Sequence, residues 1–189
     1  MKKSILLILA SLLLCQCGNQ THDEYRGRIA RKLPSDEENE AIRTLNNGEP
    51  DLENFTYLRY YNYRFDFSID YPSFLTPGTP PENGDGLDFA FGKDYEMVVY
   101  GGLNAYEITW PEIFETEKKD SDTYSVLKDN WYVLSGVDED GNVYYRKSIL
   151  HDNIIYTVIF SYPQSRKEAF DSIVKHVLES FTIPEVGVC

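Results

Sequence analysis

The sequence contains few of the residues that build metal centres and disulfide frameworks, with three cysteines and three histidines among 189 residues. No histidine or cysteine pair has the spacing typical of zinc ligands. Cys15 and Cys17 follow an apolar leader and Cys189 is the last residue, so no intramolecular disulfide framework is expected. The Gly-x-Ser-x-Gly motif of one class of hydrolases is also missing. We therefore assign no catalytic residue, metal site or cofactor from motifs.

No apolar run approaches the length of about 20 residues that a membrane-spanning helix needs. The apolar run at residues 4–14 is shorter, follows Lys2 and Lys3, and precedes a cysteine. This order is the layout of an export signal. The sequence predicts that residues 1–16 are a signal peptide and that the protein leaves the cytoplasm.

The end of this signal resembles the lipobox of bacterial lipoproteins, in which a cysteine becomes the lipidated N-terminus. Cys17 has Leu14 three residues earlier, as the lipobox requires, but Gln16 replaces the usual small residue. We assign the lipid to Cys17 rather than Cys15 because the polar region starts at Gly18. An ordinary signal peptide and an uncut anchor are the alternatives. The resemblance implies a lipid-anchored protein of the bacterial cell envelope, and Gly18, in place of the Asp that retains enterobacterial lipoproteins in the inner membrane, favours the outer membrane.

Acidic residues outnumber basic residues by 31 to 18, which gives a net charge of −13, or −15 without residues 1–16. A protein of this charge without a basic stripe repels nucleic acid. Hydrophobic residues make up 42% of the chain, which is enough to form a core. The expected partners are the membrane, through the lipid, and an envelope protein, but not nucleic acid.

Residues 17–54 are expected to form a polar tether, because they are charged and contain few aromatic residues. Ser35 and Glu38 have the spacing of a capping box, and Asn47 and Gly48 are typical of a helix end, so the tether includes a short helix. The folded domain is expected over residues 55–189, a length suited to one domain.

Alternating apolar and polar residues predict eight strands in this domain. They cover residues 57–61, 65–70, 87–91, 96–101, 122–127, 131–137, 143–150 and 154–162. Short polar turns connect the last four strands, which must therefore be antiparallel neighbours. Residues 76–86 are rich in proline and glycine and are predicted to form a loop.

Two helices are predicted to cover the strands. Thr109 can cap the first helix, with Pro111 in its first turn. Ser165 and Glu168 form a second capping box, and Pro184 follows the helix that begins there. An apolar stripe at helical spacing runs along this helix, formed by Phe170, Ile173, Val174, Val177, Leu178 and Phe181. We predict an α+β domain in which helices flank a central antiparallel sheet of about seven to eight strands, as an α/β/α sandwich.

The segment YRFDFSIDYP at residues 63–72 resembles the opening strand of the PsbP/Mog1-like superfamily. The segment PENGDG at residues 81–86 resembles part of related bacterial envelope proteins, and the strand order and last helix also fit. The resemblance covers about residues 57–183 and implies an α/β/α sandwich. Known members are an extrinsic photosystem subunit and a binder of a small GTPase, so the resemblance implies an accessory or binding role and carries over no catalytic residue.

Asn83, Asp85 and Asp88 are the candidate ligand or cation loop. Their side-chain oxygens suit a hard cation, and Gly84 and Gly86 let a ligand approach the backbone closely. A tight Asx-type turn explains the same residues without an ion. We favour the turn, and no metal is assigned to this loop.

The histidines and aromatic residues also allow two interpretations. His22, His151 and His176 are predicted to be solvated rather than catalytic. Six aromatic residues could offer a stacking surface but are predicted to pack in strands and core instead. They are Tyr57, Tyr60, Tyr61, Tyr63, Trp110 and Trp131.

These observations favour a non-enzymatic accessory or binding lipoprotein. The alternative is an envelope hydrolase whose catalytic residues are scattered along the sequence. A deep pocket that joins a histidine to a serine or carboxylate would favour the hydrolase, whereas a broad, shallow aromatic surface would favour binding.

Overall fold

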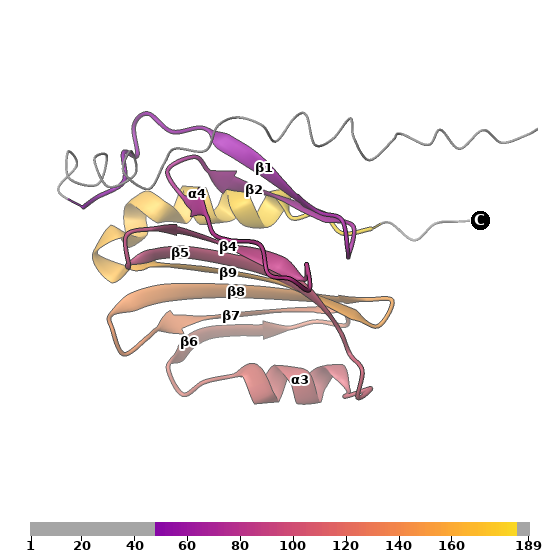
Figure 1. The fold of residues 1–189 in the computed structure, drawn as a ribbon. Helices are drawn as coiled ribbons and strands as arrows, with labels where there is room; N and C mark the ends of the chain where they lie inside the picture. Colours follow the sequence, from indigo (N-terminus) through magenta and orange to yellow (C-terminus); the bar gives the residue numbers. More distant parts are fainter. Residues whose placement is uncertain (1–47, 185–189) are drawn as a thin grey trace, which may run out of the picture. The chain divides into compact units, whose positions relative to one another are not determined.

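Seven antiparallel strands form the central sheet of residues 48–184, the part of the chain that the computed structural model describes (Figure 1). The order across the sheet is β3-β4-β5-β9-β8-β7-β6. The strands are β3 (Thr76–Pro77), β4 (Gly86–Phe91), β5 (Tyr95–Leu103), β6 (Asp122–Leu127), β7 (Trp131–Val137), β8 (Asn142–His151) and β9 (Ile154–Pro163). The predicted α+β class and antiparallel sheet are confirmed, and the loop predicted at residues 76–86 begins with the short strand β3.

The longest hairpin of the sheet, β8–β9, shows how the sequence sets the register. Asp152 and Asn153 occupy its two-residue turn with φ angles of 48° and 62°, the left-handed conformation that a tight hairpin turn requires. This turn pairs His151 with Ile154 and fixes every pair beyond them. Because side chains alternate across a strand, Tyr156 and Val158 then lie on one face of the sheet and Ile155 on the other.

Helix α4 (Lys167–Ser180) covers the first of these faces. Phe170, Ile173 and Val177 are buried against β9 and its neighbours, as the apolar stripe predicted. The ring of Phe170 stacks on Tyr162 with a centroid distance of 4.9 Å and on Tyr95 with one of 5.3 Å. Burial of an aromatic side chain of this kind is among the largest single contributions to a core.

The start of α4 differs from the prediction. No side-chain hydrogen bond caps this helix, so the capping box expected at Ser165 and Glu168 is wrong. Residues Gln164–Arg166 instead form a 3-10 turn, whose first N–H donates to the carbonyl of Gly141 at 3.1 Å. This turn already curls Ser165 into a helical conformation, whereas a capping residue needs an extended one.

A hairpin of β1 (Tyr57–Asn62) and β2 (Phe67–Pro72) forms a separate two-stranded sheet that packs beside α4 (Figure 1). Phe67 and Ile69 are fully buried in the same core as the stripe of α4. Ser68 and Thr182 exchange two backbone hydrogen bonds of 2.9 Å, which attach the chain after α4 to β2. Leu52 also packs against this core, so contacts with the domain begin before residue 55.

Helix α3 (Trp110–Glu117) covers the other face of the sheet, where it packs on β7. Trp110 and Phe114 bury Tyr132 and Leu134 in a second, smaller core. The predicted cap at Thr109 is confirmed, because the carboxylate of Glu112 accepts hydrogen bonds from the N–H and hydroxyl of Thr109 at 3.1 and 2.6 Å. Two helices on opposite faces give the three layers that the sequence predicted.

The signal peptide, Cys15, Cys17, the tether helix predicted from Ser35, and Cys189 lie outside the described residues. Neither of the α-helices described above is long and apolar enough to cross a membrane.

Candidate functional site

An open groove of about 840 Å³ runs between α4 and the face of strands β6 to β8 that α4 leaves uncovered. Val133, Tyr145 and Ile149 form much of its floor, and Val174 and Leu178 of α4 form one wall. Trp131 also lines it. The groove has the size and the mostly apolar lining of a ligand site.

The pairing of β7 with β8 places the floor residues side by side. Trp131 is opposite Ile149, and Val133 is opposite Lys147. Because both strands alternate in phase, these side chains share the face that carries α4, and Tyr132 and Leu134 point to α3. The same alternation that builds the two cores therefore also builds the groove.

Lys147 is the charged residue on the groove floor. Its ammonium donates a hydrogen bond to the carbonyl of Leu178 at 3.3 Å. Burial lowers the pKa of Lys147, and the negative charge of Glu179 partly opposes this effect. None of the ion pairs among residues 48–184 includes Lys147. The floor thus carries one partly desolvated cation without a carboxylate partner in the described domain.

The other charges of the groove lie on α4 and are already paired. Lys167 contacts Asp171 at 2.7 Å, and Lys175 contacts Glu179 at 3.8 Å. Both pairs follow the i, i+4 spacing of a helix surface and are exposed, so each contributes little to stability. Their charges cancel, which leaves Lys147 as the net charge of the lining.

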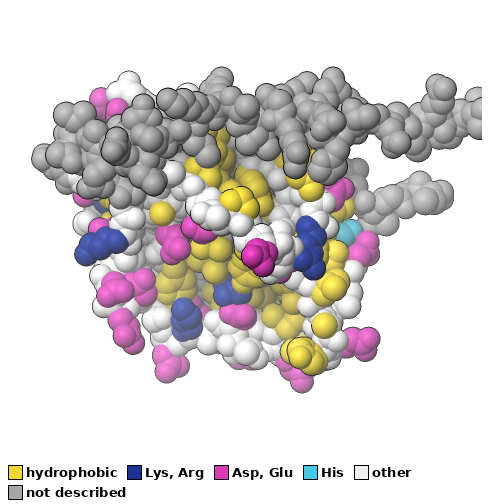
Figure 2. Space-filling view, in the orientation of Figure 1, with side chains coloured by type: hydrophobic (Ala, Val, Ile, Leu, Met, Phe, Trp, Pro, Cys, Tyr) yellow, Lys and Arg dark blue, Asp and Glu magenta, His cyan; other side chains and the backbone are white. Residues whose placement is uncertain are grey.

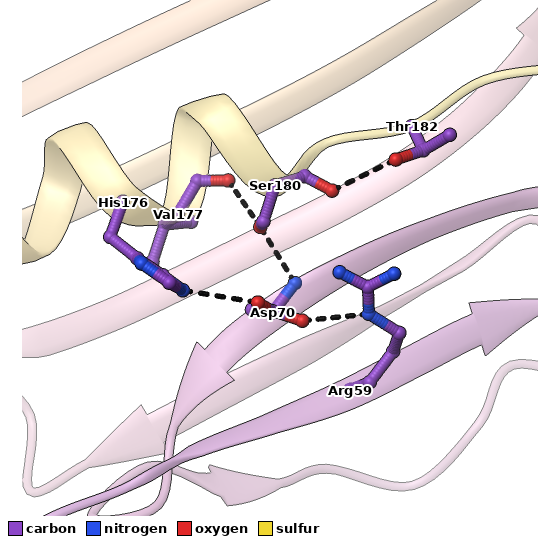
Figure 3. Close-up of polar contacts among 6 residues, drawn as sticks. All are labelled: Arg59, Asp70, His176, Val177, Ser180 and Thr182. Atoms are coloured by element: carbon purple, nitrogen blue, oxygen red, sulfur yellow. Dashed lines mark hydrogen bonds and ion pairs between the residues drawn. The ribbon is translucent and has the colours of Figure 1, made fainter.

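A polar cluster around Asp70 connects the β1–β2 hairpin to α4 (Figure 3). The carboxylate of Asp70 accepts a hydrogen bond from Arg59 at 2.7 Å and lies 3.0 Å from Nε2 of His176. The backbone N–H of Asp70 donates to Ser180 Oγ, which itself donates to the carbonyl of Val177. The contacts of Asp70 with His176 and Ser180 therefore hold the hairpin against the helix, and Arg59 supports Asp70 from within the hairpin.

The charges in this cluster favour the ionised form of Asp70. Burial by itself raises the pKa of this carboxyl, but the hydrogen bonds and positive charges of Arg59 and His176 outweigh it. The net result is a pKa below the ordinary value. Arg59 lies opposite Asp70 in the hairpin, so the strand register sets this pairing.

Of the three histidines predicted to be solvated, His22 lies outside the described residues, the side chain of His176 is 44% exposed, and His151 is less solvated than predicted. His176 stacks on the ring of Tyr57 with a centroid distance of 3.7 Å, besides its contact with Asp70. The side chain of His151 is only 18% exposed. Neither histidine is among the residues that line the groove, so the groove is not the histidine pocket that would favour a hydrolase.

The aromatic residues divide between the two interpretations. Tyr60 packs on Phe89, and Trp110, the first residue of α3, is buried against Tyr132 of the sheet, as predicted. Trp131 instead borders the groove together with Tyr145, so part of the aromatic set forms the open surface that was the alternative.

Residues 83–88 form a turn that closes between Asn83 and Asp85 and leads into β4. Asp85 contacts the guanidinium of Arg64 at 3.0 Å and accepts a hydrogen bond from Asn83 Nδ2 at 2.6 Å. Gly84 has a φ of +66°, and a Cβ on Gly86 would lie 2.0 Å from the carbonyl oxygen of Val99. Backbone geometry therefore accounts for both glycines. Groups of three or more acidic, histidine or cysteine side chains that could hold a metal do not occur in residues 48–184.

Asp88 lies beyond the turn, on β4, and its backbone carbonyl accepts a hydrogen bond from the N–H of Gly78 at 2.8 Å. Asn83 and Asp85 are thus brought together, and Asp88 belongs to the adjoining strand pair. Whether the loop binds a cation stays a prediction, which is tested below.

A second apolar surface lies in the loop before α3. Leu103, Tyr106 and Ile108 are exposed there, Tyr106 by 89%. The buried side chain of Asn104 holds this loop, because it donates to the carbonyl of Ile108 at 2.9 Å and accepts from its N–H at 3.1 Å. The exposed side chains therefore lie on a loop whose conformation is held by the hydrogen bonds of Asn104.

Acidic side chains are spread around the edge of the face shown in Figure 2, and hydrophobic side chains gather toward its middle. With a net charge of −13, most of the surface repels anions. The lysine on the groove floor is a local exception to this charge.

Comparison with known proteins supports the fold. No protein-family model and no curated protein matches the sequence. The solution structure of CyanoP, the cyanobacterial PsbP of Synechocystis sp. PCC 6803, is similar over 68% of this chain and 93% of that protein, with a TM-score of 0.52 and 14% sequence identity. The domain has a PsbP-like fold.

A crystal structure of a protein from Bacteroides thetaiotaomicron gives a TM-score of 0.38 at 18% identity, over 64% of this chain and 46% of that one. At these identities the PsbP-like likeness concerns the fold alone, so the function of this domain has to be argued from its own residues.

We predict that Asp70→Asn flattens the acid dependence of stability. Because the folded pKa of Asp70 is lowered, its contribution is complete above the ordinary value of 3.8 and is lost as the pH falls through the folded pKa. Urea unfolding between pH 3 and pH 7 should show a loss of about 1–2 kcal/mol at pH 7 in the variant and a smaller difference at pH 3. Asp94→Asn, in an exposed turn, is the control, and a constant difference across this range would contradict the assignment.

We also predict that the turn at residues 83–88 does not need calcium, because Arg64 already neutralises Asp85. Millimolar calcium should raise the melting temperature no more than sodium chloride of equal ionic strength. The decisive comparison is with Asp85→Asn. A rise that is specific for calcium and absent from this variant would make the turn a cation site.

Proposed function

We propose that this protein is a lipid-anchored accessory protein of the bacterial cell envelope whose PsbP-like domain binds a ligand in the groove beside α4. The groove is the observation that carries the proposal. It combines an aromatic and aliphatic floor with one cation, Lys147, that forms no ion pair in the described domain. An apolar surface with one polar group suits recognition and retention of a ligand.

The alternative function, an envelope hydrolase, gains no support from the described residues. A nucleophile needs a base within hydrogen-bond distance. The hydroxyl of Ser180 donates a hydrogen bond to the carbonyl of Val177. His176 contacts Asp70 and stacks on Tyr57. These groups serve the contact between hairpin and helix, so we place binding before catalysis.

The sequence supports the lipid anchor. The apolar run at residues 4–14 and Leu14 three residues before Cys17 have the layout of a lipoprotein signal. The acyl chains of a lipoprotein hold a protein at a membrane because each buried methylene adds about 0.8 kcal/mol. We infer an outer-membrane location from Gly18.

Cys17→Ser is expected to release the protein from membranes and to abolish incorporation of labelled fatty acid. In our assignment the lipid is attached to the sulfur atom of Cys17, and serine lacks this atom. Membrane fractionation and metabolic labelling measure both effects. Cys15→Ser is the matched control and should behave as the wild type; loss of labelling in this control alone would move the anchor to Cys15.

Ser135→Phe tests the groove itself. Ser135 lines the groove on β7, so a phenyl ring at this position fills part of the space that a ligand would occupy. Protein isolated from its own host should carry a compound or a protein partner that is depleted in this variant. Solvent extraction followed by mass spectrometry, and proteomics of the same samples, measure the difference.

The matched control is Ser125→Phe. Ser125 pairs with Leu134 and therefore lies on the α3 face of the sheet, away from the groove. This variant should keep whatever the wild type carries. Identical extracts and identical protein partners from wild type and both variants would refute a binding role for the groove.

A further inference from the structure

We propose that the groove ligand is a single-chain amphiphile whose carboxylate contacts Lys147 and whose hydrocarbon chain lies on the aromatic floor. This inference rests on the proposed function and names the class of ligand. Three features of the groove support it. The floor is apolar, the backbone of the floor strand β8 is already hydrogen-bonded within the sheet, and Lys147 is a cation without an ion pair in the described domain.

The floor suits a hydrocarbon chain. Tyr145, Val133 and Ile149 offer apolar surface from two adjacent strands, and Leu178 and Val174 add a wall from α4. A volume of about 840 Å³ falls in the range of small-molecule sites. Each methylene that leaves water for this surface gains up to about 0.8 kcal/mol, so a chain of ten carbons has enough apolar surface to bind.

The backbone of the central groove floor favours a hydrocarbon over an extended peptide. Strand β8 pairs with β7 on one side and with β9 on the other, so its N–H and C=O groups are engaged within the sheet. The central floor therefore presents side chains rather than free backbone groups. A peptide laid on this floor would bury its own amides without partners, at a cost of about 1–3 kcal/mol for each. A hydrocarbon chain has no such groups.

Lys147 supplies the contact for the head group. One of the three protons of its ammonium is directed to the carbonyl of Leu178, which leaves the other two for a ligand. Two donors on one nitrogen match a carboxylate. A carboxylate carries one negative charge, which a single ammonium can balance, whereas a phosphate monoester carries about two at pH 7. Arg146, the neighbour of Lys147 on β8, does not supply a second positive charge, because it is engaged on the opposite face with Glu117 at 2.6 Å.

The acidic surface of the protein does not prevent this contact. At physiological ionic strength, charges more than about 8 Å apart are largely screened from each other, so the nearest groups decide the local field. Those groups are Lys147, the pair Lys167 and Asp171, and the pair Lys175 and Glu179. Glu179 also acts on Lys147, but the lining contains three lysines and two carboxylates, so an anionic head group meets a net positive charge.

Trp131 provides the measurement. It lines the groove, whereas Trp110, the other tryptophan of the chain, is buried between α3 and the opposite face of the sheet. The full chain with Cys17→Ser and Trp110→Phe therefore reports groove occupancy through the fluorescence of Trp131. Decanoate and decanol are the probes, because they have equal chain length and differ in the charge of the head group.

We expect decanoate to bind more tightly than decanol to this protein. Lys147→Met keeps the length of the side chain and removes its charge, so it should weaken decanoate binding by about tenfold or more and leave decanol binding within about twofold. Lys93→Met, in the exposed turn between β4 and β5, is the matched control and should leave both affinities unchanged. Ser135→Phe should weaken both probes.

Equal affinities for decanoate and decanol would overturn the inference, as would decanoate binding that is unchanged in Lys147→Met. The comparison of the two probes on the protein with native Lys147 decides the question even if the methionine variant does not fold. If neither probe binds while the host extract still depends on Ser135, the ligand class is wrong and the groove function stands. If the extract does not depend on Ser135 either, both proposals fail.

Discussion

The sheet is much wider than one helix, and this difference determines which parts of the sheet face are covered and which stay open. Seven strands with a spacing of about 4.8 Å span about 29 Å, whereas an α-helix with its side chains is about 10–12 Å wide. Helix α4 therefore covers only part of its face. The β1–β2 hairpin extends the cover on one side of α4, over the core around Phe67 and Phe89. On the other side, over β6 to β8, the sheet face stays open and forms the groove.

The position of α4 is fixed by contacts of different strength on its two sides. Toward the hairpin, the side chains of Phe170 and Val177 are buried and Asp70 joins His176 and Ser180. Toward the groove, the helix offers exposed ion pairs and the carbonyl of Leu178. Buried packing and a shared polar cluster stabilise far more than exposed ion pairs do. The groove can thus carry charged, solvent-accessible groups beside the apolar wall of Val174 and Leu178 without loosening the helix.

The sequence predicted what depends on local patterns. The alternation in β7 to β9, the cap at Thr109 and the stripe from Phe170 to Phe181 each depend on near neighbours, and the structure confirms them. It did not predict the groove, which depends on where α4 lies over the sheet and on which strands it leaves uncovered. One signal was present: Lys147 interrupts the apolar face formed by Val143, Tyr145 and Ile149 of β8. The start of α4 was mispredicted because Ser165 and Glu168 match a capping box, and only the tertiary contact with Gly141 excludes it.

The charge on the groove floor links binding to stability. Placing an ammonium in a partly desolvated position opposes folding unless a partner offsets the loss of water. The carbonyl of Leu178 is a neutral acceptor and offsets only part of that loss. A carboxylate beside Lys147 would supply the missing charge, and a ligand that binds only the folded state stabilises it in proportion to the logarithm of its concentration. Lys147 therefore lowers the stability of the folded domain when the groove is empty and makes the groove selective for an anionic ligand when it is occupied. This is the physical basis for assigning recognition to this face rather than to the turn at residues 83–88.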